Sequence, residues 1–460
     1  MDIKDKIVAV EQLPVETITT KRFRREFQIY PWIKSRIFHK VIMGSEVLQE
    51  KDSSVLRTQL RSLFYGFFSF FRKYDAWAFT NSSERVLLDG KQFDKLMDPI
   101  TQAYPMRMLL VELQLFKQFK RKEVASKHVV SRAWIVFLEE LYMRVFLRKV
   151  TFSGKPVLEE VEGILNDKVP VEPIIRKYLA QYRVMKGILW LLPKPKVVFL
   201  TVSYANFGYI RAWKEAGIHV VEMQHGLIGD GHYGYIYHKR FNPDQFPDSV
   251  LVFGERDQEL FQSHSVFPAR VMPVGRYMLD YFKEKAVPNI TPVRTILVSL
   301  QDTHWSEVLL KFILEVDHLE PNRFNWVIQP RRTPESVYRQ QFDLPQNMVF
   351  SQVNVYEAMG KADAHLTIFS TTAIESISIG KPTFLYNYDS ASQTYLGQFL
   401  SSNPNAYFCD DAAAFLSACN KLVCKDKDEI SASNNANIRA DYHENMSGFM
   451  KNLMHEVAKK

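Results

Sequence analysis

From residue 196 onward the sequence repeats one pattern, in which short apolar runs rich in β-branched and aromatic residues alternate with stretches of helical length. Continuous apolar runs are typical of strands that are buried on both faces of a parallel sheet. Strands that alternate with helices predict parallel sheets joined by right-handed crossovers. The predicted strands span residues 197–202, 218–223, 249–253 and 271–274, and then 295–300, 325–329, 348–350, 364–368 and 383–385. The sequence therefore predicts the α/β class, with two Rossmann-like doubly wound domains.

A chain of 460 residues agrees with two domains, because a single hydrophobic core stops growing at roughly 250–300 residues. We predict a first domain at 1–287, a Pro-rich linker at 288–292, a second domain at 293–430 and a helical segment at 431–460. Helical patterns dominate the first 190 residues, which we interpret as an elaboration of the first domain. The exception is residues 76–80, an apolar run that predicts a buried strand. Ligands of doubly wound sheets bind at the carboxyl ends of the strands.

The overall composition is that of a folded globular protein, with 46% hydrophobic and 24% charged residues. The most apolar run, residues 63–71, is far shorter than the roughly 20 residues of a membrane span. The spacing of Cys409, Cys419 and Cys424 matches no zinc or redox motif. No signal peptide is apparent, so we expect a cytoplasmic protein.

The formal net charge is +8, and basic residues mix with aromatic ones in the first third of the chain, as at 21–25. We interpret them as a solvated basic face that also attracts anionic lipid headgroups, which places the protein peripherally at the inner face of the cytoplasmic membrane. No nucleic-acid-binding module is recognisable, so we expect no nucleic-acid partner.

The most informative segment for chemistry is 222–235, EMQHGLIGDGHYGY, which begins at the end of a predicted buried strand. Its glycines allow the backbone to approach a ligand closely. Histidine is the side chain best suited to exchange protons near neutral pH. The alternative is a Gly-rich connection with locally bonded histidines, but the strand-end position favours catalysis. His225 lies nearest the strand and is the candidate base, with His232 and Asp230 as reserves.

A second segment, residues 363–375, predicts a strand that ends at Phe369 and a helix that begins within 370–372. Free N–H groups at a helix start bind phosphate well. Glu375, one turn later, is placed to accept hydrogen bonds from ribose hydroxyls, and a capping box, in which it binds its own backbone, is an equal alternative. The predicted phosphate-binding residues are Ser370, Thr371 and Thr372.

Arginines follow two other predicted strands. Arg331 and Arg332 come directly after Gln329-Pro330, and Arg276 follows the strand at 271–274. A pair of arginines is able to hold a diphosphate with bidentate hydrogen bonds. A surface arginine pair without a ligand is the competing interpretation.

The runs EMQHGLIGDGHYGYIY, PDSVLVFGERDQELF, VMPVGRYMLDYF and ADAHLTIFSTTAIESISIGKP resemble GT-B glycosyltransferases of bacterial capsule and O-antigen assembly. The resemblance covers residues 196–386. It implies two Rossmann-like domains that face each other across a cleft and transfer a sugar, with inversion, from a nucleotide-sugar donor to a surface polysaccharide or lipid-linked glycan acceptor.

The same resemblance implies roles for individual residues. It puts residues 370–372 and Glu375 at the donor nucleotide and His225 in the catalytic loop. The run DAWAFTNSSERVLLDGKQFDKLMDP is similar to the acceptor-side region of such proteins. The acceptor-side candidates are Ser82, Ser83, Glu84, Arg85 and Tyr235.

One departure from the family pattern concerns the donor. Related capsule transferases often carry His-Pro where this chain has Gln329-Pro330, so the phosphate contact passes to Arg331 or Arg332, or the donor differs. No Asp-x-Asp motif follows a predicted strand, and we expect neither a metal nor a cofactor besides the nucleotide-sugar co-substrate.

Three alternatives to a glycosyltransferase remain. A transferase of polyol phosphate from a CDP-alditol shares the architecture and the His-Gly loop. A sugar-nucleotide epimerase ranks lower, because it needs no helical N-terminal third. A non-catalytic, nucleotide-sugar-binding scaffold subunit is the third.

Overall fold

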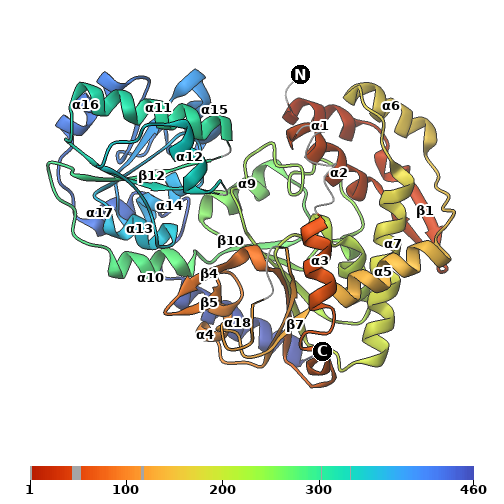
Figure 1. Cartoon of the computed structure of the whole chain (residues 1–460). Coiled ribbons are helices and arrows are strands. Elements are labelled where there is room, and N and C mark those ends of the chain that lie inside the picture. Colours follow the sequence, from red (N-terminus) through yellow and green to blue (C-terminus); the bar gives the residue numbers. More distant parts are fainter. Residues whose placement is uncertain (1–2, 44–52, 116–118, 302, 332, 460) are drawn as a thin grey trace. The chain divides into compact units, whose positions relative to one another are not determined.

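The computed structural model describes residues 3–43, 53–115, 119–301, 303–331 and 333–459 (Figure 1). By its contacts the chain forms two compact units. The first comprises Met1–Val252, Arg256–Pro273 and His443–Lys460, and the second comprises Phe253–Glu255 and Val274–Tyr442. Each unit contains one large parallel sheet with helices packed against it, so the predicted fold class is confirmed.

The sheet of the first unit has seven strands, all parallel, in the order β11-β10-β9-β8-β3-β6-β7. The strands are β3 (Ala76–Asn81), β6 (Met108–Leu113), β7 (Val129–Ser131), β8 (Val197–Leu200), β9 (His219–Met223), β10 (Ser249–Val252) and β11 (Arg270–Pro273). From β3 the chain builds outward first through β6 and β7 and then, on the other side, from β8 to β11. The strand order therefore reverses between β3 and β8.

Helices surround this sheet and supply the elaboration that the sequence predicts. They are α1 (Ile3–Gln12), α2 (Tyr30–Met43), α3 (Ser53–Ser62), α4 (Asp98–Ala103), α5 (Ala133–Phe146), α6 (Lys155–Leu165), α7 (Val171–Leu191), α8 (Phe207–Glu215), α9 (Glu255–His264) and α18 (Tyr442–Ala458). Helix α7 packs against both α5 and α8, as Figure 1 shows for α5. Aromatic side chains join helix and sheet, as where the rings of Phe79 and Trp213 lie 4.8 Å apart.

The sheet of the second unit has six parallel strands in the order β14-β13-β12-β15-β16-β17. The strands are β12 (Thr295–Ser299), β13 (Asn325–Gln329), β14 (Met348–Phe350), β15 (Ala364–Thr367), β16 (Thr383–Tyr386) and β17 (Ala406–Cys409). The helices are α10 (Tyr277–Lys285), α11 (Thr303–Leu319), α12 (Glu335–Gln341), α13 (Val355–Lys361), α14 (Thr372–Ile379), α15 (Ala391–Leu400), α16 (Ala412–Lys421) and α17 (Lys427–Ala432). Here the order reverses between β12 and β15.

The helical interpretation of the first 190 residues was wrong in part. Besides β3, this region contributes β6 and β7 to the sheet, and it forms two antiparallel hairpins. The hairpins are β1 (Thr19–Arg22) with β2 (Arg25–Gln28), and β4 (Arg85–Leu88) with β5 (Lys91–Asp94). The run of β6 is apolar at nearly every position, and periodicity alone does not separate such a buried strand from a helix.

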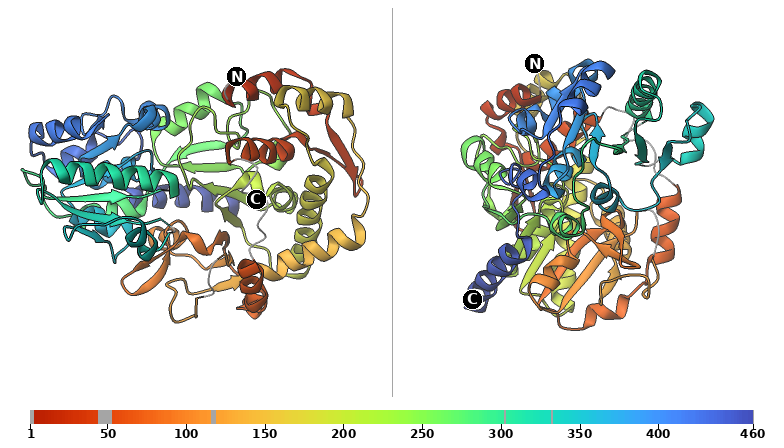
Figure 2. Two further views of the ribbon diagram at one scale, coloured as in Figure 1. Left: turned by 45° about the horizontal axis from the view of Figure 1, so that its top comes forward. Right: turned by 90° about the vertical axis from the view of Figure 1, so that its left-hand side faces the viewer.

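The boundaries of the two units differ from the ranges expected from the sequence. Helix α10 packs against α13 and α14 of the second unit through Met278, Leu279 and Phe282, which are buried. The second unit therefore begins ahead of the Pro-rich segment 288–292. Helix α18, drawn in blue and ending at the C-terminus in Figure 2, belongs by its contacts to the first unit. Within the described residues, no helix has the length and apolar content needed to cross a membrane.

Candidate functional site

Most of the predicted site residues lie near the carboxyl edges of the two sheets. In the first unit the loop that contains His225 follows β9, next to the end of β8. In the second unit the turn at Ser370 follows β15, directly beside the point where the strand order reverses. Such reversal points are where doubly wound sheets bind ligands. Each unit therefore brings polar residues to the edge at which its own sheet is suited to hold a ligand.

A buried carboxylate anchors the loop after β9. Glu222 is fully buried, and its Oε1 accepts hydrogen bonds from the backbone N–H of Ser203 at 2.8 Å and from the hydroxyl of Tyr235 at 2.7 Å. Burial raises the pKa of Glu222 to about 7, against the opposing effect of these hydrogen bonds. The acceptor-side candidate Tyr235 is thus buried. Its hydrogen bond to Glu222 joins the end of the 222–235 segment to its start.

The two histidines of this loop differ in their surroundings. Burial lowers the pKa of His225, while the carboxylate of Glu84 opposes this shift. Its Nδ1 is a buried atom without a hydrogen-bond partner among the described residues. Burial and the neighbouring His225 lower the pKa of His232 to about 3, and its Nδ1 accepts a hydrogen bond from the N–H of Gly234 at 3.2 Å. Both imidazoles are neutral at pH 7, and His225 keeps its buried Nδ1 uncommitted, whereas the Nδ1 of His232 is bound to Gly234.

The ring of Tyr204 lies near both histidines, with its centroid 6.4 Å from that of His225 and 5.8 Å from that of His232. Asp230, the third catalytic candidate, forms an ion pair with Lys4 of α1 at 2.7 Å, and both side chains are more than a third exposed. Asp230 therefore connects the loop to the N-terminal helix α1.

The polar turn after β3 makes contacts mainly within the fold. Arg85 is buried and ion-paired with Glu112 of β6. Glu84 pairs with Lys95 at 3.2 Å, and the hydroxyl of Ser82 accepts a hydrogen bond from the N–H of Leu115 at 2.9 Å. Ser83 donates from its backbone and its hydroxyl to the side chain of Asn81. Among these candidates, Glu84 approaches the catalytic loop through its effect on the pKa of His225.

In the second unit, Ser370 and Thr372 are half-buried and Thr371 is exposed at the start of α14. The N–H of Thr372 donates to the hydroxyl of Ser370 at 3.3 Å, and the buried Oγ1 of Thr372 has no hydrogen-bond partner among the described residues. Across the reversal point, the side chain of Gln301 accepts a hydrogen bond from the N–H of Phe369 at 3.2 Å.

Glu375 and Arg276, two donor-side candidates, bind each other. Both side chains are buried and form an ion pair, and Arg276 also donates to the hydroxyl of Tyr356 at 3.0 Å. The guanidinium lies 4.7 Å from the ring centroid of Phe253. The side chain of the N-cap residue Thr371 makes no capping hydrogen bond, and Glu375 pairs with Arg276 instead of the helix backbone, so the capping-box interpretation of Glu375 was wrong.

The third donor-side group is only partly described. Gln329 ends β13, and its buried Oε1 has no hydrogen-bond partner among the described residues. Arg331 is exposed, and Arg332 lies outside the described residues. No cluster of three or more His, Cys, Asp or Glu side chains able to hold a metal ion occurs within the described part of the chain.

Sequence reasoning missed two residues of this site, Glu222 and Tyr204. Glu222 stood inside the quoted EMQHG run, and a carboxylate in the middle of an apolar strand was the available signal, since such groups are rarely buried without partners. Tyr204 carries no local signal, because its contact with the two histidines depends on how the loops after β8 and β9 pack.

Comparisons with known proteins give a distant structural likeness. No protein-family model and no curated protein sequence match this chain. The wall teichoic acid polymerase TagF is 10% identical over 94% of this chain and 99% of that chain, with a TM-score of 0.47. The calicheamicin glycosyltransferase CalG4 is 12% identical over 84% and 100%, with a TM-score of 0.49.

The UDP-GlcNAc 2-epimerase of Methanocaldococcus jannaschii, solved with UDP-GlcNAc and UDP, is 10% identical over 83% of this chain and 99% of that chain, with a TM-score of 0.45. With TM-scores of 0.45 to 0.49 in these three comparisons, the likeness assigns neither a family nor an activity to this chain.

Proposed function

We propose that this protein is a glycosyltransferase that moves a sugar from a nucleotide-sugar donor to a surface polysaccharide or lipid-linked glycan. The observation that carries the proposal is His225, a neutral imidazole with an unpartnered, buried Nδ1 at the carboxyl edge of a doubly wound sheet. A neutral imidazole with a free nitrogen is the chemical requirement for a general base near pH 7.

In this proposal the two units divide the work. The second unit holds the nucleotide diphosphate at the start of α14, where Ser370, Thr371 and Thr372 present hydroxyl and N–H groups. The first unit holds the acceptor. His225 removes the proton of the acceptor hydroxyl as its oxygen attacks the anomeric carbon, the bond from that carbon to the diphosphate oxygen breaks, and the nucleoside diphosphate leaves with the electron pair. The sugar is transferred with inversion.

A panel of single donors tests the proposal. Each UDP-, GDP-, dTDP- and CMP-sugar and CDP-glycerol is incubated with the full chain, and release of the nucleotide is followed with and without EDTA. We expect release from one nucleotide sugar, at a rate that EDTA leaves unchanged. Release of CMP from CDP-glycerol identifies a polyol-phosphate transferase, an epimerised sugar identifies an epimerase, and binding without turnover identifies a scaffold subunit. Each of these outcomes rejects the glycosyltransferase.

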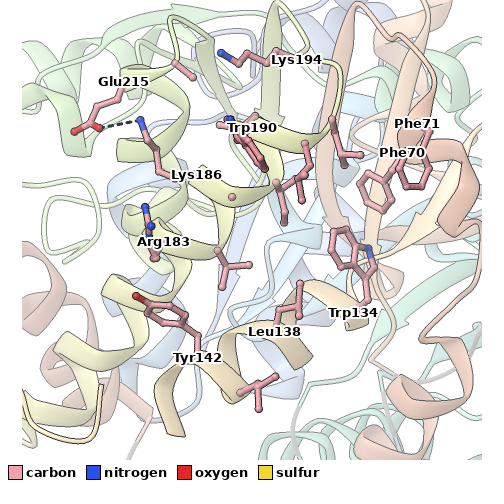
Figure 3. Close-up of a pocket in the computed structure, with 18 of the residues that line it drawn as sticks. Phe70, Phe71, Trp134, Leu138, Tyr142, Arg183, Lys186, Trp190, Lys194 and Glu215 are labelled. Atoms are coloured by element: carbon pink, nitrogen blue, oxygen red, sulfur yellow. Dashed lines mark hydrogen bonds and ion pairs between the residues drawn. The ribbon is translucent and has the colours of Figure 1, made fainter. Parts of the chain in front are cut away.

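An apolar groove in the first unit supports the further proposal of peripheral contact with an anionic membrane. The groove has a volume of about 920 Å³ and lies between residues 67–71, α5 and α7. Trp190 and Leu191 at the end of α7 are 84% and 69% exposed, and Phe146 of α5 is 59% exposed. Figure 3 shows Arg183, Lys186 and Lys194 on one side of the groove and Phe70, Phe71 and Trp134 on the other. Tryptophan prefers the membrane interface, and nearby cations attract anionic headgroups.

Liposome flotation tests this membrane contact. We expect binding to vesicles with phosphatidylglycerol that weakens as salt rises, because surface charge is screened within roughly 8 Å at physiological ionic strength. Trp190→Ala is expected to reduce binding at both salt concentrations, whereas Tyr395→Ala, at an exposed aromatic residue of the second unit, leaves it unchanged. Equal binding to neutral and anionic vesicles excludes the electrostatic account, and equal binding of the two variants excludes the groove.

A further inference from the structure

A second cavity of the first unit lies at the reversal point of its sheet. It has a volume of about 990 Å³ and is lined by the ends of β3 and β8, together with side chains of α2, α5 and α7. Thr80 and Asn81 at the end of β3 and Thr201 after β8 form its floor at the sheet edge. This is the place where a doubly wound sheet is suited to bind a ligand. No local sequence pattern indicates this cavity, because its walls come from helices that are far apart in the chain.

The walls of this cavity carry an excess of positive charge. Two carboxylates, Glu139 and Glu140, face six cations. The cations are Arg36, Arg132, Arg144, Arg148, Arg176 and Lys177. Glu139 is buried and accepts a hydrogen bond from the hydroxyl of Tyr209, and burial raises its pKa to about 7. Glu139 is therefore partly protonated at neutral pH. The net positive charge of the cavity walls is then larger than a count of six cations and two carboxylates indicates.

Several of these cations have unused hydrogen-bonding capacity. Arg36, Arg144 and Lys177 form no ion pair with any described residue. The buried Nε atoms of Arg132 and Arg176 have no hydrogen-bond partner within the described chain. Burial and the neighbouring Arg36 lower the pKa of Lys177 to about 8. Buried donors without partners are rare in folded proteins, so these two Nε atoms are available to an acceptor that enters the cavity.

We propose that this cavity is an acceptor subsite that binds an oxyanion, the carboxylate of an acidic sugar or the phosphate of a phosphorylated glycan. Two contacts hold the guanidinium of Arg132 in the cavity wall. Its Nη2 donates to the side chain of Asn206 at 2.9 Å, and its guanidinium lies 4.9 Å from the ring centroid of Tyr209. These contacts hold the guanidinium plane in place while leaving Nε free. Lys177 and Arg36 supply the remaining positive charge from α7 and α2.

The cavity also borders the proposed base. Thr201 lines the cavity, and its backbone is close enough to His225 to affect the pKa of that imidazole. An acceptor whose charged group binds in the cavity extends along the carboxyl edge of the sheet toward His225. The name acceptor subsite rests on the proposed glycosyl transfer, whereas the binding of an oxyanion does not depend on it.

Direct binding measurements on the full chain test the proposal. Glucuronate, glucose 6-phosphate and neutral glucose are titrated by calorimetry. The anion that binds more tightly shows whether the cavity prefers a sugar carboxylate or a sugar phosphate. We expect both anions to bind more tightly than glucose, and Lys177→Gln and Arg36→Gln each to weaken anion binding about tenfold, as expected for a lost charge-assisted hydrogen bond. Lys168→Gln, at an exposed lysine of the same unit, is the matched control and keeps wild-type affinity.

Acidity provides a second measurement. Glucuronate stays ionised over this range, so its affinity reports the charged protein groups that face it. These are Glu139, Glu140 and Arg144 of α5, Arg132 and Arg148 at the two ends of α5, Arg36 of α2, and Lys177 and Arg176 of α7. Affinity is expected to fall between pH 6.5 and pH 9, because Glu139 gains negative charge and Lys177 loses positive charge over that interval.

Two results would overturn the inference. Equal affinity for glucose and both anions removes the oxyanion site. The second result is competition for the same site by a nucleoside diphosphate. If UDP displaces glucuronate and Lys177→Gln also abolishes the binding of UDP, the cavity belongs to the donor. If no donor is turned over but the anions bind as expected, the oxyanion site stands and the glycosyltransferase proposal alone fails.

Discussion

Replacing His225 with alanine is expected to lower turnover by about 10²–10⁴-fold while donor affinity stays within a few-fold of wild type. The reason is that the acceptor hydroxyl then has no side chain positioned to take its proton, whereas the donor is proposed to bind the second unit. Turnover is measured with the donor found in the panel, and donor binding by calorimetry.

The two reserve residues of the same loop provide controls for this prediction. Asp230→Asn removes an exposed ion pair with Lys4, which is worth about 0–1 kcal/mol, and turnover is expected to remain near wild type. His232→Ala removes a buried, locally bonded imidazole, so its main expected effect is on stability. Near-normal turnover in His225→Ala would reject the assignment, and a product with retained configuration would remove its chemical basis.

The pH dependence of the wild-type enzyme makes the same assignment testable without a substitution. Burial lowers the pKa of His225, and a base acts only when it is deprotonated. We therefore expect kcat for a neutral acceptor to decline on the acidic side, with a midpoint below the ordinary imidazole pKa of about 6.5. An acidic limb with its midpoint above 6.5 would identify a different group as the base.

Replacing Glu375 with alanine is expected to destabilise the second unit by about 3–5 kcal/mol, because the change removes the carboxylate that pairs with the buried guanidinium of Arg276. The expected loss of stability differs from what a direct contact between Glu375 and the donor ribose predicts. In that case the melting temperature stays unchanged and only nucleotide binding is lost. The measurement is thermal unfolding of the full chain, together with nucleotide binding at a temperature where the variant is folded.

A double substitution separates the two roles of this pair. Glu375→Leu combined with Arg276→Met replaces the buried ion pair with apolar side chains, and it is expected to regain most of the stability that Glu375→Ala loses. If the double variant is stable and still binds the nucleotide, the pair is structural. If Glu375→Ala keeps the wild-type melting temperature and loses nucleotide binding, the carboxylate contacts the donor and the ion pair is not needed for folding.

The sequence by itself determined five of the six strands of the second sheet, and the edge strand β17 was not predicted. Buried parallel strands are continuous apolar runs, so strands such as β13 and β14 were predicted with the bounds that the structure has. Polar residues also follow the predicted strands that became β9 and β15. The sequence therefore placed the His225 loop and the Ser370 turn at the carboxyl edges of the two sheets. This information is local, and each strand carries it within its own few residues.

Only the tertiary structure decided which sequence-distant groups meet. The run of β6 satisfies a helical pattern as well as a strand, and its position beside β3 in the sheet settled the matter. Arg276 and Glu375 are 99 residues apart, and the packing of α10 against α14 brings them into one ion pair. The cations of the second cavity come from α2, α5 and α7 in the same way. Periodicity records how each element faces the core, but the partner of a buried charge depends on which elements pack together, and no local pattern encodes that.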